Sequence, residues 1–120
     1  GSVRKQICRM GWEAENPDLE FVDVVGHSWF FKKSWAGYFW SETPLLQHFG
    51  EDIHFCAVLQ KRGIRAACPP HPPGSKSLWG SLKPDIGVDK VAISCSTDRS
   101  HDYYRVVNHE IRNGFTPMLW

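Results

Sequence analysis

The segment from Gly50 to Gly63 most constrains the fold, because the sequence marks both ends of a helix there. Two adjacent carboxylates, Glu51 and Asp52, open the segment, and mainly apolar residues follow. Acidic side chains favour a helix start, where backbone N–H groups are unpaired and the helix dipole is positive, and glycine favours a helix end. The pattern predicts a helix over 51–62 that begins with acidic side chains.

This acidic start has two interpretations. Asp is among the best residues at a helix N-terminus, so Asp52 can be an ordinary cap. The same position keeps a carboxylate ionised, and an ionised carboxylate can accept a proton as a general base. The two roles are compatible, since the helix start that binds the carboxylate also keeps it ionised.

The rest of the chain predicts short elements around a second helix. Apolar residues recur at helical spacing over 102–113, just before Gly114. Ser34 is placed to cap a short helix over residues 35–40. Apolar and β-branched runs predict short strands over 21–25, 64–68 and 88–95. The expected fold class is therefore α+β or partial α/β, with few short strands and two main helices.

Size and charge limit the classes of protein to which the chain can belong. Its 120 residues, 42% of them hydrophobic, suit one domain, which we expect over 3–120 because Gly1-Ser2 resembles the remnant of a cleaved tag. A net charge of +1 lacks the basic excess of a nucleic-acid-binding protein. No apolar run reaches the roughly 18 residues of a membrane span.

The cysteines favour reduced thiols. Four are present at wide and irregular intervals without a C-x-x-C pair, namely Cys8, Cys56, Cys68 and Cys95. This spacing argues against a structural zinc site, although two disulfides remain an alternative. Cys56 falls in the apolar part of a predicted helix, where a free thiol behaves as a small hydrophobe. We expect a cytoplasmic protein, with peripheral attachment to a membrane as a second option.

Two motifs carry a family resemblance. Residues 26–33 read Gly-His-Ser-Trp-Phe-Phe-Lys-Lys, and residues 51–55 read Glu-Asp-Ile-His-Phe. In this order and spacing they resemble the C-terminal, acceptor-side half of a family-two glycosyltransferase with the GT-A fold. The resemblance covers about residues 21–75, and residues 105–115 resemble the tail helix of some bacterial members. It implies an incomplete GT-A-like domain.

The resemblance also implies roles for individual residues. Asp52 corresponds to the general base that deprotonates the acceptor hydroxyl, with Glu51 beside it. The candidate substrate-binding residues are Trp29, Trp35, Lys32 and His27, and the candidate metal ligand is His71. Each has a structural alternative: core packing for the tryptophans, a solvated charge for the lysine, and a turn between prolines for His71. A metal-dependent hydrolase has no supporting motif.

The nucleotide-binding units and the Asp-x-Asp metal motif of the family do not occur in these residues. The resemblance implies a sugar-nucleotide donor, a glycan or other hydroxyl acceptor, and Mg²⁺ or Mn²⁺ in the complete enzyme. We expect the isolated chain to be inactive, with no metal of its own, and an exposed sheet edge to favour a homodimer. The alternative function is a non-enzymatic module that binds carbohydrate or protein.

Overall fold

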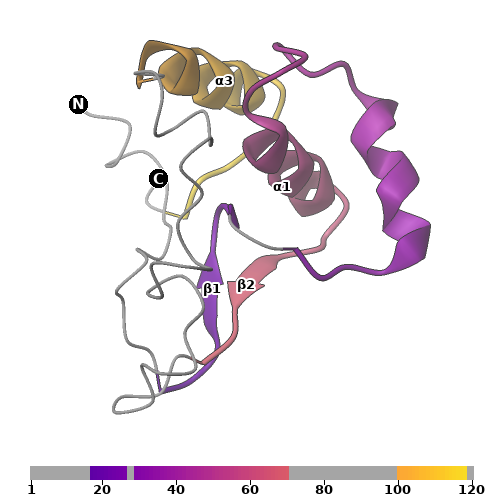
Figure 1. Cartoon of the computed structure of the whole chain (residues 1–120), viewed down its shortest axis with the longest axis vertical. Coiled ribbons are helices and arrows are strands. Elements are labelled where there is room, and N and C mark those ends of the chain that lie inside the picture. Colours follow the sequence, from indigo (N-terminus) through magenta and orange to yellow (C-terminus); the bar gives the residue numbers. More distant parts are fainter. Residues whose placement is uncertain (1–16, 27–28, 71–99, 119–120) are drawn as a thin grey trace, which may run out of the picture.

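The computed structural model describes residues 17–26, 29–70 and 100–118. These residues form an α+β arrangement, as the sequence predicted, with a two-stranded sheet below two packed helices (Figure 1). The elements are β1 (Glu20–Val22), the 3₁₀ helix η2 (Lys33–Ser41), α1 (Glu51–Lys61), β2 (Ala66–Cys68) and α3 (Ser100–Arg112). Helix α1 lies between α3 and η2 and contacts both.

Helix α1 matches the predicted helix to within one residue. Gly50 precedes its first turn with φ of 82° and Gly63 follows its last turn with φ of 80°, a left-handed conformation that glycine adopts without a steric penalty. At the C-terminus the N–H of Ile64 donates to the carbonyl of Leu59 at 3.0 Å, and the N–H of Gly63 donates to Gln60 at 2.9 Å. These bonds form a Schellman motif, so the helix ends at the position that Gly63 predicted.

The predicted helix over 102–113 is α3, which spans Ser100–Arg112. It therefore starts two residues earlier and ends one residue earlier than predicted. Its end is closed like that of α1: the N–H of Phe115 donates to the Glu110 carbonyl at 2.9 Å, and the N–H of Gly114 donates to Ile111 at 3.1 Å. The motif turns Phe115 back under the helix, where its ring is buried. Phe115, three residues after α3, therefore belongs to the core.

The sheet is shorter than predicted. Strands β1 and β2 pair antiparallel, with Glu20 opposite Cys68 and Val22 opposite Ala66. Beyond Val22 the chain leaves the ladder, and the buried Asp23 carboxylate accepts hydrogen bonds from the backbone N–H of Met118 at 3.0 and 3.2 Å. These bonds attach the C-terminal segment to the residue that follows β1. The strand predicted over 88–95 lies outside the described residues.

The short helix predicted over 35–40 is instead a 3₁₀ helix that begins at Lys33. Ser34 lies inside it, so the predicted Ser34 cap is wrong, and the residue at the N-cap, Lys32, forms no side-chain cap. No residue of η2 is fully buried. Its aromatic residues do not form one apolar stripe, and without such a stripe a regular α-helix gains little from packing.

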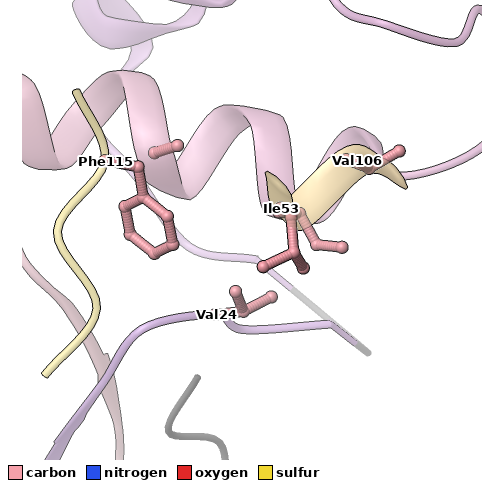
Figure 2. Close-up of a cluster of buried hydrophobic side chains, with 6 residues drawn as sticks. Val24, Ile53, Val106 and Phe115 are labelled. Carbon is pink, nitrogen blue, oxygen red and sulfur yellow. The ribbon is translucent and has the colours of Figure 1, made fainter. Parts of the chain in front are cut away.

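The core joins segments that are far apart in the sequence. Figure 2 shows Ile53 of α1, Val106 of α3, Val24 of the segment after β1 and Phe115 of the C-terminal segment converging on one cluster. The buried members are Val24, Ile53, Ala57, Val106, Val107 and Phe115. Partly buried Leu45, Leu46 and Phe49 pack against this cluster. The start of α1 is thereby fixed against α3 and against the end of the β1 segment.

Candidate functional site

Asp52 is the second residue of α1 and is half-buried. Its Oδ1 accepts a hydrogen bond from the backbone N–H of Ile53 at 2.8 Å. Its Oδ2 faces Gly26, where a Cβ atom would lie only 3.2 Å from this oxygen. The absence of a side chain at Gly26 therefore gives the backbone after β1 a close approach to the carboxylate. The two predicted motifs meet at this point.

A pocket with a volume of about 270 Å³ lies at Glu51, the residue before Asp52. Its walls come from η2, from the loop that follows, and from the first residue of α1. The aromatic and aliphatic lining includes Phe39, Trp40, Leu46 and Phe49, and the polar lining is Gln47 and Glu51. Glu51 thus faces the pocket, whereas Asp52 is not among the described lining residues.

The two candidate tryptophans have different surroundings. The Trp29 indole N–H donates to the Val25 carbonyl at 2.9 Å, and its ring packs on Phe55 with centroids 5.7 Å apart. Trp29 is therefore anchored to the protein as well as partly exposed. Trp35 is half-exposed, and the Lys32 ammonium lies 5.4 Å from the centre of its ring, in cation–π range. Lys32 itself is exposed.

His27 and His71 lie outside the described residues. Within residues 17–26, 29–70 and 100–118, no group of three or more His, Cys, Asp or Glu side chains could hold a metal ion. These residues therefore do not supply a ligand set for the Mg²⁺ or Mn²⁺ that the resemblance implies.

A buried ion pair links α1 to α3. His54 and Glu110 are each 1% exposed, and Nδ1 of His54 lies 2.6 Å from Oε1 of Glu110. On the other side of the ring, Nε2 donates to the Phe39 carbonyl of η2 at 2.9 Å. One imidazole thus ties together α1, α3 and η2.

The pKa of His54 is raised above its ordinary value of 6.5. Burial on its own lowers this pKa, since a buried charge loses hydration. The hydrogen bonds to Glu110 and to the Phe39 carbonyl, with the negative charges of Glu110 and Glu42, outweigh that effect. The imidazolium form, in which both ring nitrogens carry hydrogens, suits two acceptors at once.

The stability that His54 contributes is expected to decline as the pH rises. Because its pKa is higher in the folded state, this contribution is fully present below pH 6.5 and is lost as the pH rises through the folded-state pKa. The free energy of unfolding of wild type and His54→Gln, measured by urea denaturation from pH 6 to 9, should converge with rising pH. Thr43→Ala, at an exposed position without a titratable group, should run parallel to wild type. Parallel curves for His54→Gln would show a neutral imidazole throughout.

The sequence reasoning missed this pair, although a signal was present. His54 lies between apolar residues of the 51–62 pattern, and Glu110 lies on the apolar stripe of the 102–113 pattern with Val106 and Val107. A polar residue on the buried face of a helix requires a partner. Two such residues of complementary charge, one on each of the two main helices, predict a contact between them.

Cys56 carries a free thiol, in agreement with the prediction of reduced cysteines for this residue. Burial raises the pKa of this thiol to about 11, an effect that the negative charges of Asp52 and Asp23 reinforce and a hydrogen bond to the Val25 backbone opposes. At neutral pH the thiol stays protonated, and a protonated thiol is a poor nucleophile. Cys56 is a packing residue.

Comparison with family models, with curated proteins and with solved structures finds no match to this chain. Among the described residues, no helix is both long enough and apolar enough to cross a membrane.

Proposed function

We propose that this chain is the acceptor-side, catalytic-base portion of an inverting glycosyltransferase that uses a sugar nucleotide, and that Asp52 is the base. The observation that carries the proposal is the approach of Gly26 to the Asp52 carboxylate. It joins the Gly-x-x-Trp-Phe-Phe-Lys motif to the Glu-Asp motif beside a pocket with aromatic walls. In this proposal the described elements are part of an incomplete GT-A-like domain.

Asp52 has the properties that the reaction requires of a base. Its carboxylate is held at a helix start, where the dipole stabilises its charge, and the residue is half-buried, not fully enclosed. In the reaction Asp52 takes the proton of the acceptor hydroxyl, and the oxygen forms a bond to the anomeric carbon of the donor sugar. The bond between this carbon and the diphosphate breaks, and its electron pair leaves with the nucleoside diphosphate.

The leaving diphosphate requires positive charge from the other half of the complete enzyme. A divalent metal there, Mg²⁺ or Mn²⁺, supplies that charge when bound. On this chain, Lys32 is exposed near the Trp35 ring and is the candidate contact for an anionic group of the substrate.

The second candidate is a non-enzymatic module that binds carbohydrate or protein. It is favoured by the exposure of large aromatic side chains, with Trp40 76% exposed and Phe30 fully exposed. Exposed aromatic residues are enriched in interfaces. In this function, Asp52 would only stabilise the start of α1 through its bond to the Ile53 N–H.

The substitution Asp52→Asn separates the two functions. In the protein that joins these residues to a nucleotide-binding half, transfer from a panel of nucleotide sugars should lose about 10²–10⁴-fold in kcat, because the amide cannot accept the proton. The KM for the donor should remain unchanged, since donor contacts lie in the other half. Asp18→Asn makes the same chemical change at an exposed residue outside α1 and serves as the control.

Retention of wild-type kcat by Asp52→Asn would refute the assignment of Asp52 as the base. The sequence upstream of Val3 gives an independent test of the class. An Asp-x-Asp motif after alternating strands and helices would support the transferase, and an upstream sequence without them would contradict it.

A further inference from the structure

We propose that the pocket between η2 and the start of α1 binds a single uncharged pyranose ring, with Trp40 as its stacking surface. This inference deepens the proposed function by naming the chemical class that occupies the acceptor side, and it rests on that function only in assigning the ring to the acceptor. The binding itself needs no donor half.

The size of the pocket suits a small ligand. Its volume of about 270 Å³ is just below the roughly 300–1,000 Å³ of sites for drug-sized ligands. Its composition also matches a ligand site, since apolar and aromatic walls surround a small number of polar groups. Phe39 and Trp40 form one wall from η2, and Leu46 and Phe49 come from the loop before α1.

Trp40 has the exposure that a stacking platform requires. Its side chain is 76% exposed, and its ring meets the Phe39 ring in a T-shaped contact with centroids 4.6 Å apart. That contact restrains the indole while most of its surface remains in water. The C–H groups on a pyranose face can cover such a ring and remove apolar surface from water.

The polar groups of the pocket select an uncharged ligand with hydroxyl groups. Glu51 supplies a carboxylate that accepts hydrogen bonds, and Gln47 supplies an amide that both donates and accepts. None of the described lining residues is basic. A phosphate or diphosphate would therefore meet a negative charge without compensation, which disfavours a nucleotide in this pocket.

The pocket wall next to Trp40 is Phe39, and buried residues hold its backbone in place. His54 donates to the carbonyl of Phe39, and its other nitrogen is bound to Glu110 of α3. Both His54 and Glu110 are buried, so this anchor is shielded from water. A wall fixed before binding loses less conformational entropy when the ligand arrives.

The test is a titration of the 120-residue chain, labelled with ¹⁵N, with methyl β-D-glucopyranoside, methyl β-D-galactopyranoside and methyl α-D-mannopyranoside. The indole N–H resonance of Trp40, assigned from Trp40→Phe, should shift saturably with at least one of them. Trp40→Ala should weaken that binding, read from backbone resonances of Gln47 and Glu51, about tenfold or more. Glucose 1-phosphate should bind wild type more weakly than the neutral glycosides do, and Glu51→Gln should reduce this difference.

Phe30→Ala is the control, because it removes an aromatic residue that is even more exposed than Trp40 and is not among those described as lining the pocket. It should leave the affinity unchanged. Absence of a saturable shift at Trp40 with all three glycosides, or equal binding by folded Trp40→Ala, would overturn the proposal. If Trp40→Ala does not fold, as judged by circular dichroism, Glu51→Ala supplies the same comparison.

The saccharide titration and the transfer assay of Asp52→Asn can fail separately, so they distinguish the pocket from the proposed function. Saccharide binding at Trp40 together with full transfer by Asp52→Asn would keep the pocket and refute the role of Asp52. Loss of transfer by Asp52→Asn without any saccharide shift at Trp40 would keep the base and refute the pocket.

Discussion

Glu110→Ala is expected to lower the free energy of unfolding by about 3–5 kcal/mol, the usual cost of removing one partner of a buried ion pair. Glu110 is 1% exposed and holds Nδ1 of His54 at 2.6 Å. Without it the buried imidazole either keeps an unpaired charge or loses its proton and its partner, and both outcomes are costly. Such a loss is a large part of the roughly 5–15 kcal/mol that stabilises a typical domain.

Urea denaturation, followed by far-UV circular dichroism at pH 6, measures this change. Glu20→Ala, at an exposed position of β1, is the control and should stay within about 0.5 kcal/mol of wild type. The double variant His54→Leu with Glu110→Met should be more stable than Glu110→Ala alone, because it removes both charges and leaves neither group unpaired. A cost of Glu110→Ala below about 1 kcal/mol would mean that the pair does not hold the helices together.

The two main helices could be predicted because their ends are encoded locally. Gly50, Gly63 and Gly114 mark helix boundaries within one or two residues of the observed ones, and apolar spacing gives the length between them. Each signal acts over a few residues. The pattern 51–62 therefore predicted α1 without any knowledge of its neighbours.

The lengths of the strands and the form of η2 depend on contacts that one segment does not reveal. Pairing between the strands ends at Val22, and the next residue, Asp23, binds the Met118 N–H, 95 residues away. Ser34 suggested a short helix over residues 35–40, but the choice of a 3₁₀ helix over Lys33–Ser41 depends on what the segment packs against. Local patterns cannot encode such distant partners.

The candidate site, too, could be predicted from the sequence only in part. The position of Asp52 at a helix start followed from its immediate neighbours, and the structure places it there. The approach of Gly26 arises when the segment after β1 meets α1, and the pocket at Glu51 arises when η2, the loop and α1 come together. The anchoring of Phe39 by His54 likewise requires three elements. The sequence therefore identified candidate functional residues but did not predict which residues surround them.

Gly50→Ala is expected to lower the free energy of unfolding by about 2–5 kcal/mol, because two penalties add at this residue. Its φ of 82° is costly for alanine, and the new Cβ would lie 2.8 Å from Cγ1 and 2.9 Å from Cγ2 of Val106 in the core. Either α3 moves away or the helix start that holds Asp52 is displaced.

Gly63→Ala isolates the backbone penalty, since Gly63 has nearly the same φ, 80°, but nothing within 4 Å of the new Cβ. It should cost only the backbone term of about 1–2 kcal/mol. In urea denaturation, the difference between the two variants therefore measures the contact of Gly50 with Val106. Adding Val106→Ala should cost less in the Gly50→Ala background than in wild type, because the shortened side chain makes room for the methyl group. Equal losses of unfolding free energy in Gly50→Ala and Gly63→Ala would instead mean that α3 moves away without a cost in stability. The start of α1 would then not depend on close packing against Val106.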